Sequence, residues 1–265
     1  MKIFCISIFD ENFEEFKNLN LIPVGLGKAN FGKNWLNDKG LNNISSKNSH
    51  FGEYTFHYNL WKNNLTLSNS DEWIGFCSYR RFWSNNDSPQ INSYKNLQNL
   101  IVREPLKNWN DYDVVLGKPL IFKKIKNMKL IKRNFIEVLK KPTVLFKDNS
   151  LMDHFNIFHG SFFLKTALNH LSPDDRNGFV KYLNNYELNP YNMFICKNIK
   201  ILFKFYEAIF PWLFKCENDF KDIKLNGYDK IRIYGFLAER FMPYWFKKNY
   251  KTITCPIIFF DGTNK

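Results

Sequence analysis

The sequence predicts an α/β domain. In the first half of the 265-residue chain, short apolar runs rich in β-branched and aromatic residues alternate with segments of helical periodicity. Strands that alternate with helices usually form a mostly parallel sheet flanked by helices, and the second half has a mainly helical pattern. No repeat, low-complexity tract or Pro/Ser-rich linker divides the chain. We therefore expect one domain over residues 1–265, with a strand-rich half (1–125) and a mostly helical half (126–265).

The predicted strands share enrichment in β-branched and aromatic residues and are bounded by Gly, Pro, Asn or Asp. They are residues 2–9, 21–27, 73–77 and 113–119, with 191–197 as a short strand or strand-like turn, and residues 252–260 close the chain as an extended segment. The first strand runs directly into Asp10 and Glu11 and is too short for a signal peptide. No window approaches the roughly 18–20 apolar residues of a membrane span.

The predicted helices follow the 3.6-residue period. Phe51, Tyr54, Tyr58 and Trp61 recur on one face of a helix that begins near Ser49, and we interpret this aromatic stripe as core. The other predicted helices are 13–19, 151–171, 172–186 with a Ser-Pro-Asp-Asp start, 199 onward with a kink or split at Pro211, and 231–246. The segments without a regular pattern are 35–46, 64–71 and 84–108.

The net charge is +13, and only seven of the 38 basic residues are arginine. The accompanying surplus of Asn, Phe and Ile is typical of an AT-rich coding sequence, so the charge carries little functional information. A basic surface still favours an anionic membrane face or a phosphorylated substrate, with nucleic acid less expected. The densest basic run, 123–133, is interpreted first as a solvated loop and helix face. The five cysteines are dispersed and form no CxxC, which indicates reduced thiols in the cytosol rather than disulfides or zinc.

The stretch 71–83 carries the strongest functional signal. The apolar run 73–77 is followed at once by Arg80 and Arg81 among aromatic residues. Ligands of open α/β sheets bind at the carboxyl ends of the strands, and arginine suits phosphate because it donates two parallel hydrogen bonds. We interpret the pair as the site for the diphosphate of an activated sugar. The alternative is a solvated strand end with aromatic neighbours in the core.

A metal-dependent sugar transferase usually has Asp-x-Asp after a strand. The only such spacing here is Asp111-Tyr112-Asp113, which precedes its strand and lies at the wrong edge of a parallel sheet. We interpret these acids as the start of a strand and keep them only as weak metal candidates. The fixed cations Arg80 and Arg81 could neutralise a leaving diphosphate instead. Mn²⁺ or Mg²⁺ remains open, and no other cofactor is indicated.

Glu239 is the candidate catalytic base, because an inverting transferase needs a carboxylate to accept the proton of the acceptor hydroxyl. It follows Gly235 by four residues in a predicted helix. Arg240 lies about 100° round that helix and need not pair with it. The alternative is a structural ion pair of Glu239 with Arg232 or a lysine. The chain lacks GxSxG, P-loop, GxGxxG and HExxH motifs.

Several separated blocks together resemble a bacterial family of domains of unknown function that are encoded in capsule, exopolysaccharide and lipopolysaccharide gene clusters and assigned as glycosyltransferases. The blocks lie at 22–27, 43–48, 53–55, 58–63, 74–82, 191–195 and 234–241. The residue before Tyr79-Arg80-Arg81 is commonly His in that family and is Ser78 here. If that His served catalysis or donor binding, this chain lacks it.

The resemblance implies a GT-A-like, Rossmann-like sheet and a nucleotide-sugar-dependent transferase, with hexosyl or galactofuranosyl transfer among its members. The first half would bind the nucleotide sugar, and the helical half would hold acceptor and catalytic residues. Carried over onto this chain, the nucleotide-sugar-binding candidates are Asn43, Lys47, Asn48, Glu53, Lys62, Arg80, Arg81, Asn192 and Arg240, with Trp61 as a further candidate and Glu239 as the catalytic residue. Lys47, Arg80 and Arg81 would bind the diphosphate, and Asn192 would orient donor or acceptor.

The sequence thus leads to a cytoplasmic glycosyltransferase that transfers a sugar from a nucleotide-diphosphate donor to a glycan or lipid-linked glycan acceptor. Peripheral contact with the anionic inner leaflet is an additional expectation, and no nucleic acid is expected. The alternative is a non-catalytic basic module that binds a membrane surface or nucleic acid.

Overall fold

The computed structural model describes residues 1–63, 71–87, 90–91, 93–122 and 148–262. Their main feature is an eight-stranded sheet in the order β10-β4-β3-β8-β5-β9, with β1 paired to β3 and β2 to β1. Its strands are β1 (Lys2–Ser7), β2 (Ile22–Gly25), β3 (Ile74–Ser78), β4 (Arg81–Trp83), β5 (Val114–Gly117), β8 (Phe194–Cys196), β9 (Thr252–Cys255) and β10 (Ile257–Phe259). A separate pair is formed by β6 (Leu120–Ile121) and β7 (Glu187–Leu188).

The sheet is mixed. β1 runs parallel to β2 and β3, and β5 runs parallel to β9. β8 lies antiparallel between β3 and β5, and β4 and β10 are antiparallel to their neighbours. As a result, the amino end of β8 lies beside the carboxyl end of β3, at the sheet edge where β1 also ends. The predicted α/β class with a helical C-terminal part is confirmed.

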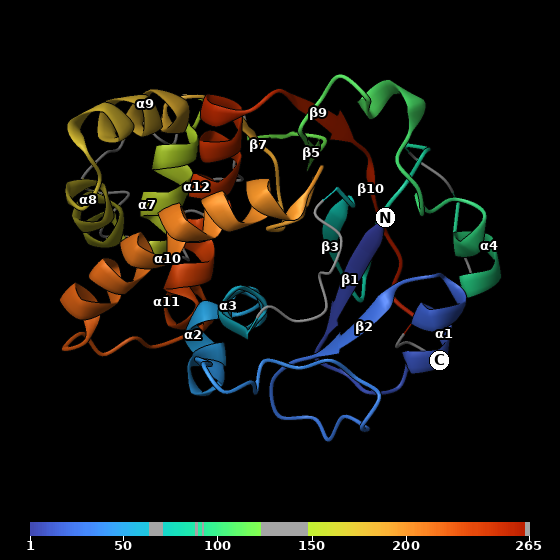
Figure 1. The fold of residues 1–265 in the computed structure, drawn as a ribbon. Helices are drawn as coiled ribbons and strands as arrows, with labels where there is room; N and C mark the ends of the chain where they lie inside the picture. Colours follow the sequence, from blue (N-terminus) through green and yellow to red (C-terminus); the bar gives the residue numbers. More distant parts are fainter. Residues whose placement is uncertain (64–70, 88–89, 92, 123–147, 263–265) are drawn as a thin grey trace.

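Helices cover both faces of the sheet (Figure 1). The helices are α1 (Phe13–Asn18), α2 (Asn48–Phe51), α3 (Tyr54–Asn63), α4 (Tyr94–Gln98), α7 (Leu151–His159), α8 (Ser161–Asn169), α9 (Pro173–Leu183), α10 (Ile199–Phe220), α11 (Tyr228–Ile231) and α12 (Ile233–Asn249), with short 3₁₀ turns at Ser45–Lys47 and Lys107–Trp109.

Two predicted helices are each interrupted by a glycine. Gly160 has φ 102° and separates α7 from α8, and Gly52 has φ 58° and separates α2 from α3. Left-handed backbone is accessible to glycine without the Cβ clash that other residues incur, so both breaks are built into the sequence. Pro211, where a kink or split was expected, lies inside a continuous α10.

Alternation along the strands divides the core into two clusters. Phe4, Phe76 and Phe194 face the side covered by α3, α10 and α12. Their strand neighbours Cys5 and Cys77 face the opposite side, in the cluster that also contains Phe16 of α1 and Leu97 of α4. Successive side chains of a strand point to opposite faces, and both faces of this sheet are buried. The central strands are therefore apolar at nearly every position, as the sequence indicated.

His57 lies in the larger cluster and is completely buried. Its Nδ1 lies 2.7 Å from Tyr206 Oη, and its ring is 4.1 Å from the Phe76 ring. Burial disfavours the charged imidazolium and lowers the pKa of His57 from 6.5 to about 3. This histidine is therefore a neutral core residue at physiological pH.

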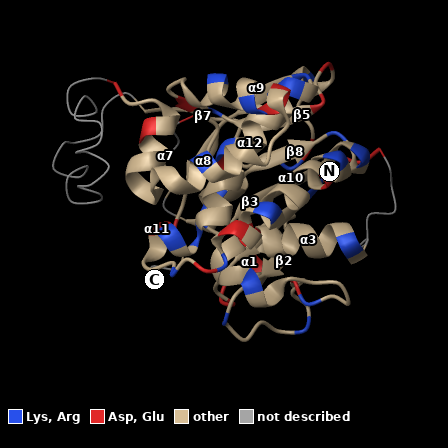
Figure 2. Cartoon of the chain, turned by 90° about the vertical axis from the view of Figure 1, so that its left-hand side faces the viewer, with Lys and Arg blue, Asp and Glu red and all other residues tan. Residues whose placement is uncertain are grey.

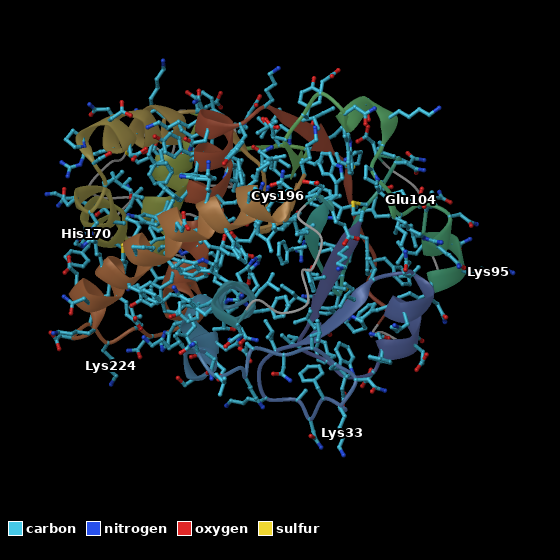
Figure 3. All side chains as sticks on the ribbon, viewed as in Figure 1. Lys33, Lys95, Glu104, His170, Cys196 and Lys224 are labelled. Carbon is cyan, nitrogen blue, oxygen red and sulfur yellow. The ribbon has the colours of Figure 1, made fainter. Side chains whose placement is uncertain are left out.

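Charged residues are distributed over many elements. In Figure 2, Lys and Arg segments are interspersed with Asp and Glu segments on the elements that face the viewer. Figure 3 shows Lys33, Lys95 and Lys224 at the periphery and Cys196 in the interior. All five cysteines are buried and free. The basic run 123–133 lies outside the described residues, and none of the described helices meets the length and apolarity needed to cross a membrane.

Candidate active site

A cavity of about 460 Å³ lies at the carboxyl ends of β1 and β3. One wall comes from these strands and the start of β4, and the other comes from the α2–α3 junction, α11 and α12. The turn before β8 contributes Tyr191 and Asn192. The lining side chains that carry charge are Glu53, Arg80, Arg81, Arg232 and Glu239.

The β3–β4 connection places the two predicted arginines at this cavity. Ser78 of β3 pairs directly with Arg81, so Tyr79 and Arg80 form a two-residue loop and Arg81 begins the next strand. The sequence predicted both arginines at the end of one strand. The structure corrects this, because the chain reverses at Tyr79 and Arg80, and Arg81 starts the antiparallel strand β4.

The two arginines differ in their partners. Arg80 Nη1 lies 3.2 Å from Asp261 Oδ2, and its guanidinium packs 4.8 Å from the Tyr79 ring. Arg81 makes no ion pair with any described residue. Its guanidinium carbon lies 4.1 Å from the centre of the Tyr191 ring. Arg81 therefore brings an uncompensated positive charge to the cavity.

Two carboxylates lie on the opposite wall, and each is held by an arginine. Glu53 Oε2 is 3.0 Å from Arg232 Nη2, and Glu53 Oε1 accepts a 2.7 Å hydrogen bond from Asn192 Nδ2. Glu239 Oε2 pairs with Arg240 Nη1, and Glu239 Oε1 accepts a 2.8 Å hydrogen bond from the Tyr191 amide. The alternative partner considered for Glu239, Arg232, instead binds Glu53. Glu239 and Arg240 pair even though they are consecutive on α12.

Gly52 explains how Glu53 and Arg232 come together. A Cβ atom on Gly52 would lie 2.3 Å from Arg232 Nη2, so only glycine lets the guanidinium approach the α2–α3 junction. The positive φ of Gly52 then directs the chain into α3 with Glu53 at the cavity. Both properties require glycine at this position.

Asn192 connects the turn before β8 to the helical wall. Besides Glu53, its Nδ2 donates to the Gly235 carbonyl at 3.3 Å, and its Oδ1 accepts from Tyr54 Oη at 3.2 Å. Burial raises the pKa of Tyr54 well above its usual value, and Glu53 and Glu239 raise it further. The Tyr54 hydroxyl therefore stays protonated and can donate to Asn192 at any physiological pH.

The structure brings Glu53, Arg80, Arg81, Asn192 and Glu239 to one cavity, from segments separated by up to 186 positions along the chain. Glu53 and Asn192 had been selected only through the family resemblance. Their placement beside Glu239 is a geometric result.

Other candidates from the sequence lie away from this cavity. Lys47 pairs with Glu217 of α10 at 2.7 Å, because α2 packs against the helical half. Asn43 organises a turn by binding Gly40 and Ser45.

Three more candidates have local structural roles. Asn48 binds the Gly52 carbonyl and Thr55, and Lys62 lies 3.4 Å over the Trp61 ring. Trp61 itself stacks on Phe210 of α10 and belongs to the core packing. These residues stabilise the frame of the domain and do not line the cavity.

Arg240 borders the site without lining the cavity. Its side chain is 4% exposed and lies between Glu239, His154 at 3.3 Å and the Phe155 ring. Arg240 fixes the Glu239 carboxylate through this ion pair. Because its side chain does not line the cavity, we do not expect it to donate to a ligand there.

Arg232, Tyr191 and Tyr228 also line the cavity, although the sequence did not predict them as site residues. Arg232 had been considered only as an ion-pair partner. Tyr228 is 64% exposed and lies 5.6 Å from the Arg232 guanidinium. Tyr228 and Arg232 are only four positions apart, but Arg232 contacts Glu53, and Tyr191 contacts Arg81 and Glu239, across distant parts of the chain. Residue spacing therefore gave no signal that these side chains line one cavity.

The chain matches the family described as domain of unknown function DUF4422 over residues 6–250. It belongs to this family. The family resemblance expected from the sequence is thus confirmed. A comparison with curated proteins gives no match.

The DUF4422 chain also has the fold of a solved structure, the apo form of the bifunctional glycosyltransferase WbbM. The TM-score is 0.66 at 20% sequence identity, and the match covers 99% of this chain and 45% of that one. The chain therefore spans less than half the length of WbbM. At this identity the likeness shows a shared fold.

The described acidic residues of this DUF4422 chain form no cluster that fits a divalent-metal site. Among the described residues, no group of three or more His, Cys, Asp or Glu side chains is arranged to hold an ion. Asp113 precedes β5 and accepts a 3.1 Å hydrogen bond from the Lys251 amide, as expected for the start of a strand. Asp111 does not line the cavity, and the two carboxylates that do are each bound to an arginine.

Proposed function

We propose that this chain is a glycosyltransferase that moves a sugar from a nucleotide-diphosphate donor to a hydroxyl of a growing bacterial surface polysaccharide. The observation that carries the proposal is the uncompensated guanidinium of Arg81. It lies beside Arg80 at the carboxyl end of β3 and lines a cavity that also contains a carboxylate, Glu239. The WbbM-like fold supports the same reaction class.

In this proposal the β3–β4 wall binds the donor. The Arg81 guanidinium donates to the diphosphate, because it contacts the Tyr191 ring and its donors are not used by an acid of the described residues. Arg80 contributes a second positive charge while sharing its donors with Asp261. Together these charges stabilise the nucleoside diphosphate as it leaves.

The helical wall serves the acceptor. In an inverting displacement, Glu239 takes the proton of the acceptor hydroxyl while the oxygen of that hydroxyl forms a bond to the anomeric carbon of the donor sugar. The bond from that carbon to the diphosphate oxygen breaks, and the electron pair leaves with the nucleoside diphosphate. Arg240 and the Tyr191 amide hold the Glu239 carboxylate in place, and Asn192 orients a substrate at the junction of the two walls.

The finer assignments are also proposals. They are a GT-A-like fold, hexosyl or galactofuranosyl transfer, a role in capsule, exopolysaccharide or lipopolysaccharide synthesis, a lipid-linked glycan acceptor, and a cytoplasmic location with peripheral inner-membrane contact. The division into a nucleotide-sugar-binding half (1–125) and an acceptor half (126–265) remains a prediction. It is supported by the two walls of the cavity, which come mainly from these two halves.

A thermal-shift screen tests the function. Ligands that bind the folded chain raise its melting temperature, so at least one of the UDP, GDP or CDP sugars is expected to stabilise it, with CMP sugars, which carry a single phosphate, as the comparison. If stabilisation comes only from anionic vesicles or oligonucleotides, with steep salt dependence, the protein is instead the binding module considered as the alternative. Activity that EDTA abolishes and Mn²⁺ or Mg²⁺ restores would contradict the arginine-based neutralisation.

A further inference from the structure

Arg81 is held differently from the other arginines that line the cavity. Arg80 and Arg232 each pair with a carboxylate. Arg81 instead lies 4.1 Å over the Tyr191 ring, with Phe259 farther away at 5.8 Å. An aromatic ring attracts a cation through its face and uses none of the N–H donors. This contact fixes the guanidinium without neutralising it.

The backbone at Tyr191 is the least expected feature of the site. Tyr191 and Asn192 have φ angles of 74° and 53°, and left-handed backbone at two consecutive non-glycine residues is rare, above all for a bulky aromatic side chain. Such conformations persist only when the surroundings enforce them, and they concentrate at functional sites.

Both carboxylates of the cavity enforce this turn. Glu239 accepts a hydrogen bond from the Tyr191 amide, and Glu53 accepts one from the Asn192 side chain. β8 then begins at Phe194, antiparallel to β3. The turn therefore places the Tyr191 ring beside Arg81, which begins the strand after β3.

We propose that Tyr191 is a positioning residue whose ring holds Arg81 ready to bind the diphosphate, and that the left-handed Tyr191–Asn192 turn exists to place that ring. The inference rests on the proposed function, because it assigns the anion on Arg81 to a donor diphosphate. It assigns Glu239 a second role, since the same carboxylate that faces the cavity also fixes Tyr191.

The experiment compares Tyr191→Phe, which keeps the ring, with Tyr191→Leu, which keeps apolar bulk but removes the π face. Binding of UDP and of inorganic pyrophosphate is measured by calorimetry at low ionic strength, with melting temperatures recorded for every variant. Phe259→Leu is the matched control, because Phe259 is the more distant ring over the same guanidinium. Each Tyr191 variant is also made in an Arg81→Ala background.

Tyr191→Leu is expected to weaken binding of both probes by about two- to tenfold, the cost of immobilising one long side chain. Tyr191→Phe and Phe259→Leu are expected to bind within about twofold of the original chain. In the Arg81→Ala background, Tyr191→Leu should have no further effect, since its effect acts through Arg81.

Equal binding by Tyr191→Leu and the original chain overturns the positioning role. The positioning role is also overturned if Tyr191→Leu weakens binding equally in the original and the Arg81→Ala background, or if Tyr191→Phe weakens binding as much as Tyr191→Leu. Either result indicates that Tyr191 has a structural role alone. If the original chain binds pyrophosphate but no nucleotide, the proposed function fails while the Tyr191 comparison still decides the positioning role. If it binds neither probe, both proposals fail.

Discussion

Removing the Arg81 guanidinium is expected to weaken nucleotide binding strongly while changing the free energy of unfolding little. A hydrogen bond to a charged group contributes about 1.5–3 kcal/mol. Because Arg81 has no acid partner among the described residues, its truncation to alanine leaves no buried carboxylate behind. The Kd for UDP, or for whichever nucleotide stabilises the chain, should therefore rise about 10- to 150-fold in Arg81→Ala.

The same substitution should have a small effect on the free protein. Arg81→Ala removes the contact between the guanidinium and the Tyr191 ring at 4.1 Å, and cation–π contacts at partly exposed sites contribute about 0.5–1 kcal/mol to stability. Urea unfolding of the ligand-free variant should therefore show a free energy of unfolding within about 1 kcal/mol of the original. Titration calorimetry with UDP, GDP and CDP provides the binding half of the comparison.

Lys62→Ala is the matched control. It removes one positive charge that also lies over an aromatic ring, 3.4 Å from the centre of Trp61, but Lys62 does not line the cavity. Its nucleotide affinity should stay within about twofold. The reasoning is refuted if Arg81→Ala binds as well as the original or if Lys62→Ala weakens binding equally. A large loss of ligand-free stability in Arg81→Ala would instead assign that arginine to the structure.

Three further predictions follow from the site and core. Glu239→Gln should lower the transfer rate about 10²- to 10⁴-fold with nucleotide affinity nearly unchanged, and a rate within fivefold of the original excludes Glu239 as the base. The same substitution should lower the free energy of unfolding by an amount on the order of 3 kcal/mol, because the buried Arg240, 3% exposed, loses its carboxylate partner. The variant is therefore assayed well below its melting temperature. Gly52→Ala should cost about 1–2 kcal/mol in urea unfolding from the positive φ alone and should also displace Arg232; unchanged unfolding contradicts this. The pKa of His57 is lowered from 6.5 to about 3, so between these pH values the unfolded chain binds a proton that the folded chain does not, and the folded state loses stability as the pH falls. From pH 7 to 4.5 this loss should be about 2–3 kcal/mol in the free energy of unfolding measured with urea. The loss should be absent in His57→Gln.

Much of the frame could be predicted from local pattern. The apolar run 73–77 forms β3 (Ile74–Ser78) because a strand buried on both faces needs apolar residues at consecutive positions. Ser172 and Pro173 begin α9, as their capping chemistry predicts. The arginines lie near the carboxyl end of β3 because they follow this strand closely in the sequence, and the parallel pairing of β1 and β3 brings the carboxyl end of β1 to the same edge.

The site itself depends on contacts that local pattern does not contain. Lys47 was a reasonable phosphate ligand by residue type, but its partner Glu217 is 170 positions away, and only the packing of the helical half brings the two together. The left-handed turn at Tyr191 carries no glycine signal, since hydrogen bonds from distant carboxylates maintain it. Both cases reflect tertiary interactions that override residue-type expectations.

The central claim is that Arg81 and Arg80, at the turn between β3 and β4, hold the diphosphate of a sugar donor. A crystal structure with UDP, or with the nucleotide that gives the largest thermal shift, tests it most directly. The account predicts diphosphate oxygens within hydrogen-bonding distance of the Arg81 guanidinium, with that group still in contact with the Tyr191 ring. A diphosphate bound elsewhere on the molecule, with Arg81 and Arg80 making only contacts to the protein, would contradict it.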